Sequence, residues 1–185
     1  TVPGGGNYIA DDLDSWLIGP LSILFKLNNG YIRQTQQLRA ALEREMAILA
    51  ARKCTPLDAA ELWRILSNID KAEDEKIRGE LDKELHTQIA KIANNPMIYS
   101  VLAAADQLTE NIIAGTRDYI MKKNRPEFKV DEQHRLLVEA IINNDEKGAE
   151  QYMSEHMEII EKCMDEMQKN SNNKRPANGI VIGGE

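Results

Sequence analysis

The chain has 185 residues, which is enough for one domain with a hydrophobic core, and its formal net charge of −7 argues against direct binding of this stretch to nucleic acid. Aromatic residues make up only 5% of the chain, so the composition favours helices packed through aliphatic and methionine side chains. Two isolated cysteines, Cys54 and Cys163, and the lack of an apolar run of about 20 residues predict a cytoplasmic protein with no membrane partner.

The first thirty residues contain a glycine turn and a predicted helix. Gly4 to Gly6 precede a short strand-like stub at Tyr8 and Ile9, and a helix is expected from Asp11 to Leu27. Asn28 to Gly30 then break the chain, because Asn and Gly favour turns.

Two amphipathic helices are predicted next. The first runs from about Tyr31 to Lys53 and carries an apolar stripe. The second begins at Thr55-Pro56, since Thr is a good N-cap, Pro suits the first helical position and Asp58 completes a capping pattern. The stripe residues of these two helices are Leu38, Leu42, Met46 and Leu49, then Leu62, Ile65, Leu66 and Ile69.

Four more helices complete the prediction, which is an all-α, antiparallel bundle of about six or seven helices enclosing a metal or ligand pocket. Asn95-Pro96 opens one of these helices by the same cap-then-proline pattern, and Asn124 to Pro126 stop it. The polar, Asn-rich residues 169–185 are predicted to form a flexible tail. The four expected helices are Glu73 to Ala93, Asn95 to Lys122, Val130 to Ile142 and Glu146 to Met167.

All three histidines of the chain lie on the apolar stripe of a predicted helix. His86 shares a face with Ile89, His134 with Leu137, and His156 with Met153 and Ile160. The 3.6-residue period therefore predicts that all three imidazoles point into the bundle.

Asp82 precedes His86 by four residues, so the two side chains lie one turn apart on the same helix face. Together with His134 and His156 they make a nitrogen and oxygen donor set for a divalent cation, with coordination positions left for water or a ligand. Zinc is the first expectation; nickel, manganese and iron also suit such donors. Each histidine could instead be a core residue with a single hydrogen-bond partner.

At this point the sequence resembles a known family. Arg39-x-x-x-Glu43, Ala47-x-Leu49-Ala50-Ala51-Arg52, Asp82-x-x-x-His86, Asn95, His134 and His156 are similar in order and spacing to the C-terminal ligand-binding domain of FadR-like regulators in the GntR superfamily. They resemble its metal-binding branch, although Leu85 replaces a phenylalanine common before the first histidine.

The resemblance implies a domain organisation. Residues 1–10 would be the remnant of a winged helix-turn-helix wing and linker, and residues 11–168 would be the effector-binding domain. It also implies a homodimer that senses a small carboxylate effector and controls DNA binding by an N-terminal domain absent from this stretch.

Arg39 and Arg117 match arginines of the family pattern and are the predicted effector contacts, because a guanidinium forms bidentate hydrogen bonds with a carboxylate. An ion pair with Glu43, four residues away, is an equally good explanation of Arg39. Asn95 is better explained as an N-cap.

Two other functions remain open at the level of sequence. A metal-dependent hydrolase could use the same donors, but no motif places a general base and the Glu-x-x-His pairs of di-iron bundles are missing. A purely structural or interaction bundle would need no metal. We expect a regulator and not an enzyme.

Overall fold

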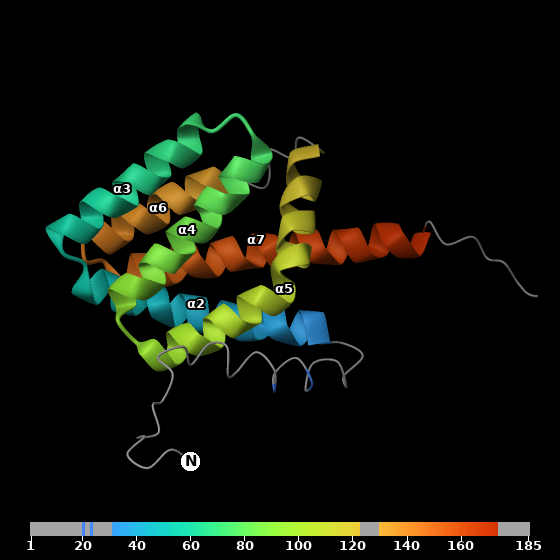
Figure 1. Ribbon diagram of the computed structural model, residues 1–185, viewed down its shortest axis with the longest axis horizontal. Coiled ribbons are helices and arrows are strands. Elements are labelled where there is room, and N and C mark those ends of the chain that lie inside the picture. The colour runs from blue at the N-terminus through green and yellow to red at the C-terminus, as the bar shows by residue number, and fades with distance from the viewer. Residues whose placement is uncertain (1–19, 21–22, 24–30, 123–129, 174–185) are drawn as a thin grey trace, which may run out of the picture.

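The structure, a computed structural model, describes residues 20, 23, 31–122 and 130–173. Over these residues the chain is a helical bundle without a strand, which confirms the all-α prediction (Figure 1). The six helices of this part are α2 (Tyr31–Lys53), α3 (Pro56–Lys71), α4 (Glu75–Ala93), α5 (Pro96–Lys122), α6 (Val130–Ile142) and α7 (Glu146–Asn173).

The capping signals placed most helix starts correctly. The Thr55 hydroxyl accepts a hydrogen bond from the Asp58 amide, and the Asp58 carboxylate accepts one from the Thr55 amide at 3.0 Å, so a capping box begins α3. The Asn95 side chain caps α5 by accepting a hydrogen bond from the amide of Ile98. Helix α4 begins at Glu75, two residues later than expected, because the Asp74 side chain caps it.

The last helix is longer than predicted. Helix α7 continues to Asn173, whereas the sequence suggested an end near Met167. The remainder of the predicted tail, the features expected before residue 31 and the stop at Asn124 to Pro126 lie outside the described residues, apart from residues 20 and 23.

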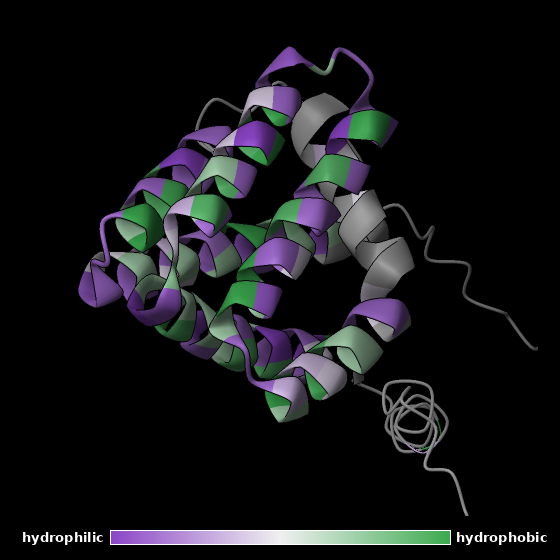
Figure 2. Ribbon diagram, turned by 60° about the vertical axis from the view of Figure 1, so that its left-hand side comes forward, coloured by the Kyte–Doolittle hydropathy of each residue, from purple (hydrophilic) through white to green (hydrophobic). Residues whose placement is uncertain are grey.

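Helix α2 contacts four other helices of the described part of the chain. It packs against α4, α5, α6 and α7, while α3 lies beside α4 and α6 on the outside (Figure 1). Hydrophobic and hydrophilic residues occupy different sides of the helices (Figure 2). The predicted α3 stripe is fully buried, which confirms that this face meets the core.

A tight turn joins α6 to α7 and holds both against α2. Asn144 in this turn has a left-handed backbone with φ of 57°, and its side-chain amide donates to the Ala51 carbonyl at 2.6 Å. Asp145 caps α7 by accepting a hydrogen bond from the amide of Gly148. The turn therefore fixes the two helices that carry His134 and His156.

Candidate metal centre

The three histidines come together from three helices. His86 on α4, His134 on α6 and His156 on α7 each place a ring nitrogen within 4.8 Å of the other two. Their ring centroids are 5.7, 5.1 and 4.7 Å apart. Two imidazole nitrogens bound to one zinc ion at about 2.1 Å are at most about 4.2 Å apart, so small side-chain rotations would suffice to share a cation.

Two of these imidazoles are buried without hydrogen bonds that would satisfy them. His134 is fully buried and His156 is 3% exposed. Within the described part of the chain, Nδ1 of His134 and Nδ1 of His156 have no hydrogen-bond partner. Nε2 of His134 makes no hydrogen bond of good geometry, although the Asp82 carboxylate lies 3.0 Å from it. Leaving a buried polar group unsatisfied costs about 1–3 kcal/mol, so core histidines are normally paired. This arrangement favours ligands over ordinary core residues.

Burial also changes the protonation of His156. Desolvation, followed by the neighbouring rings of His134 and His86, lowers the pKa of His156 well below its usual value. A neutral imidazole has a nitrogen lone pair to offer, and neutral imidazole is the form that binds metal.

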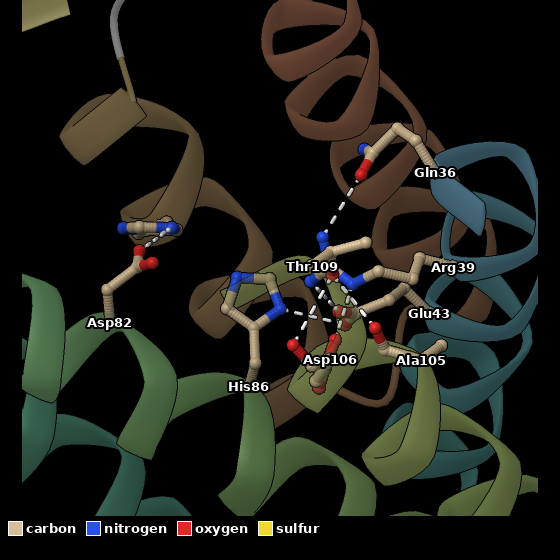
Figure 3. A network of polar contacts seen from close by, with 9 residues as sticks. Gln36, Arg39, Glu43, Asp82, His86, Ala105, Asp106 and Thr109 are labelled. Atoms are coloured by element: carbon tan, nitrogen blue, oxygen red, sulfur yellow. Dashed lines mark hydrogen bonds and ion pairs between the residues drawn. The ribbon is translucent and has the colours of Figure 1, made fainter. Parts of the chain in front are cut away.

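Asp82 lies beside His134. Its Oδ1 atom is 3.0 Å from Nε2 of His134, and its side chain is only 16% exposed. Asp82 is one turn before His86 on α4, as the sequence predicted (Figure 3). All four predicted ligands therefore lie in one region of the bundle, with three imidazoles grouped together and the carboxylate against one of them.

His86 has a second carboxylate neighbour, Glu43 of α2. Nδ1 of His86 lies 2.7 Å from Oε2 of Glu43, whose side chain is 1% exposed. Burial alone would lower the pKa of His86, but the charge and hydrogen bond of Glu43 outweigh it and raise the pKa to about 9. The same contact, with help from Arg39, holds the pKa of Glu43 below its usual value although burial opposes this.

Arg39 lies in a buried polar network with Glu43 (Figure 3). Its guanidinium donates to Gln36 at 3.1 Å, to Glu43 at 3.1 Å and to Asp106 of α5. Burial by itself raises the pKa of Asp106, although the guanidinium partly offsets the effect. The intrahelical ion pair expected between Arg39 and Glu43 is present. Contact of Arg39 with an effector stays a prediction.

Arg117, the other predicted effector contact, belongs to α5, but its side chain lies outside the described part of the structure. Its role therefore also stays a prediction.

A cavity of about 340 Å³ opens between α4 and α5 beside His86. His86 and Asp106 both contribute to its wall, and Lys83 adds a cation. The volume is at the lower end of ordinary ligand sites, which suits a small metabolite. The complete lining is Lys83, His86, Thr87, Ala90, Tyr99, Leu102, Ala103, Asp106 and Gln107.

Sequence reasoning missed two residues of this region, Asp106 and Lys83, and one contact, that of Glu43 with His86. Asp106 could have been noticed, because it is an acidic residue directly after the apolar helical stretch Val101 to Ala105. The contact of Glu43 with His86 spans 43 residues and had no local signal. Lys83 resembles any exposed helix lysine until the cavity is known.

Comparison with known proteins identifies the fold family. Residues 34–159 match the FCD domain. The chain belongs to the FCD domain family. The resemblance to the effector-binding domain of FadR-like GntR regulators is thereby confirmed.

Relatives of this FCD domain are named as regulators. The chain is 24% identical over 165 residues to the Escherichia coli (strain K12) "Putative L-lactate dehydrogenase operon regulatory protein" and 28% identical over 160 residues to the Bacillus subtilis (strain 168) "Uncharacterized HTH-type transcriptional regulator YcbG". The alignments cover 87% and 84% of this chain but only 64% and 63% of the relatives. The chain thus spans less than two thirds of the length of these relatives.

Proposed function

We propose that this FCD domain is the effector-sensing part of a transcription regulator, and that it binds a divalent metal and a small carboxylate. The observation that carries the proposal is the group of three inward-facing imidazoles, two of them buried with unsatisfied nitrogens. The regulator names of its relatives support the sensing role.

In this proposal His86, His134, His156 and Asp82 hold the cation. Zinc is the first candidate because it is often bound by imidazole and carboxylate ligands. Nickel, manganese and iron accept the same donors. A bound cation would supply Lewis acidity toward a carboxylate at an open coordination position. Cationic side chains of the protein would orient the carboxylate of the effector.

The cavity between α4 and α5 is the proposed effector site. It reaches His86, so a ligand inside it would lie beside the centre. Lys83 joins Arg39 and Arg117 as a cation for the effector carboxylate. The lactate operon named for the Escherichia coli relative makes L-lactate the first acid to test.

Metal content tests the centre. Protein purified without chelator should contain about one divalent ion per chain by elemental analysis, and His134→Ala should lose it. Leu137→Ala is the matched control, because it also shortens a fully buried side chain of α6 but leaves the ligands intact. Equal metal content in wild type and His134→Ala would contradict the proposed centre.

Effector binding is tested by native mass spectrometry and by thermal shift of the metal-loaded protein. Carboxylates that bind should raise the melting temperature of wild type, and Lys83→Met should weaken the shift. No shift with lactate, pyruvate, dicarboxylates, tricarboxylates or sugar acids would contradict a carboxylate effector.

Control of DNA binding needs two further proposals, a homodimer and an N-terminal winged-helix domain beyond this stretch. An effector changes DNA affinity only if it favours one dimer arrangement. The 185-residue chain alone should be dimeric in light scattering and should not bind operator DNA. Tight sequence-specific binding by the isolated chain would overturn this assignment.

Two alternative functions have distinct outcomes. Ester or phosphoester hydrolysis that is lost in His134→Ala would favour a metal-dependent hydrolase. A folded wild type with no metal and no thermal shift on adding one would favour a structural or interaction bundle.

The cytoplasm is the proposed location of the protein. In the described part of the chain, no helix has the length and apolar character needed to cross a bilayer.

A further inference from the structure

Glu43 is a buried carboxylate whose two oxygens have different partners. Oε2 lies 2.7 Å from Nδ1 of His86, and Oε1 accepts a hydrogen bond from Arg39 at 3.1 Å. The side chain is 1% exposed, so water contributes little to holding it. Glu43 is on α2, whereas the three grouped histidines are on α4, α6 and α7.

The contact with Glu43 decides which nitrogen of His86 faces the other histidines. A carboxylate is an acceptor, so Nδ1 of His86 carries the proton in this contact. When His86 gives up its second proton to bind a cation, Nδ1 keeps its proton toward the carboxylate and Nε2 supplies the lone pair. Outer carboxylates of this kind fix the tautomer and orientation of metal-binding histidines.

Arg39 in turn fixes the orientation of Glu43. Its guanidinium is held by three acceptors, Gln36, Glu43 and Asp106, from α2 and α5. Rotating the Glu43 carboxylate away from His86 would therefore also break its bond with a buried cation. Such a rotation is costly because the remaining charge would lack a partner.

We propose that Glu43 is a positioning residue of the metal centre, which holds His86 in the tautomer and orientation that present Nε2 to the cation. This inference rests on the proposed function. It extends the centre from its four ligands to a fixed chain of contacts, His86–Glu43–Arg39–Asp106, whose two ends both line the cavity. A ligand that contacts Asp106 would thus be linked to a cation bound at His86 through the contacts of Arg39 and Glu43.

The test uses Co²⁺ alone as the probe and measures its dissociation constant by titration of the metal-free protein. Glu43→Gln keeps the shape of the side chain but removes its charge, and it should weaken Co²⁺ binding about 10- to 100-fold, the usual effect of losing an outer carboxylate. Gln36→Met is the matched control, because it also removes a buried hydrogen bond of Arg39 without touching His86. This control should bind Co²⁺ within about threefold of wild type.

Two further measurements separate positioning from a general loss of structure. Glu43→Gln should have no additional effect on Co²⁺ affinity in the His86→Ala background, because the residue acts through that ring. In the metal-free protein above pH 9, where the His86 ring is neutral, its nitrogen NMR signals should report a proton on Nδ1 in wild type and a mixture of tautomers in Glu43→Gln. Far-UV circular dichroism should be the same for all variants.

The outcomes are distinguishable. If wild type binds no Co²⁺, the proposed centre is wrong and the inference falls with it. If wild type binds but Glu43→Gln keeps its affinity within about twofold, or Gln36→Met loses as much, the centre stands and the positioning role of Glu43 is overturned. An equal loss from Glu43→Gln in the His86→Ala background would also overturn it.

Discussion

At the scale of single residues, Arg39 shows how buried charges hold two helices together. Its side chain is 9% exposed and lies between Glu43 of its own helix and Asp106 of α5. A buried ion pair contributes modestly when complete, but removing one partner leaves uncompensated charge in the interior. The loss of Arg39 therefore affects both carboxylates.

Arg39→Met should lower the free energy of unfolding by about 3–5 kcal/mol, because the buried carboxylate of Glu43 and the partly buried carboxylate of Asp106 would lose their shared cation. Urea denaturation followed by circular dichroism measures this change. Arg64→Met is the matched control, since Arg64 also binds two carboxylates, Glu61 and Glu84, but at the surface, where its loss should change stability far less. Similar losses in both variants would contradict the importance of burial.

Residue-level prediction worked where a local period was sufficient. The inward direction of His86, His134 and His156 followed from their places on apolar stripes. The partner of His86 did not, because Glu43 is brought to it by the crossing of α2 and α4, and no local pattern encodes a crossing.

At the scale of elements, the α6–α7 turn depends on Asn144. This residue combines a left-handed backbone with a hydrogen bond to Ala51, so it joins the turn to α2. Asn tolerates the left-handed region better than residues such as Ala, and Gly tolerates it best.

Asn144→Ala should destabilise the domain by about 1 kcal/mol more than Asn144→Gly, because only Ala adds backbone strain to the lost hydrogen bond. Thermal unfolding of the two variants measures the difference. Asn143→Ala provides a neighbouring control, because the Asn143 side chain donates to the Glu139 carbonyl within its own turn. A larger loss in Asn144→Gly than in Asn144→Ala would contradict the role of the backbone.

Helix limits were predicted well where side chains cap the ends. Thr55 and Asn95, each followed by proline, marked the starts of α3 and α5 correctly. The end of α7 was missed because residues after Met167 are polar without a strong breaker, so composition alone suggested a tail while the helix continues.

At the scale of the whole molecule, the proposed metal centre would connect α4, α6 and α7, which all pack against α2. A ligand that binds only the folded state stabilises it by an amount that grows with its free concentration, about 2.7 kcal/mol at one hundred times its dissociation constant. Metal binding should therefore act on the stability of the entire bundle.

Removing divalent ions with a chelator should lower the melting temperature of wild type, and adding them back should restore it in a concentration-dependent way. Differential scanning calorimetry measures both changes. His134→Ala should melt at the same temperature with and without metal. A chelator effect that persists in this variant would show that the ion stabilises the fold from elsewhere.

The all-α bundle and the meeting of three histidines could be predicted at this scale, since two of the ring-bearing helices follow one another through a tight turn. A pocket was expected, but its place between α4 and α5 could not be predicted, because it depends on the sizes of the side chains that line these two helices.

The helices that would hold the ion are not all the helices that line the cavity, and this difference affects how the metal and the metabolite exchange. None of the four proposed ligands lies on α5, although α5 forms one wall of the cavity. On the proposed function, α5 would contact the metabolite but not the ion, so exchange of the metabolite would not require α4, α6 or α7 to release the ion. The cation would then stay bound while the metabolite exchanges. The domain could therefore respond to changing metabolite concentrations without losing and rebinding its metal.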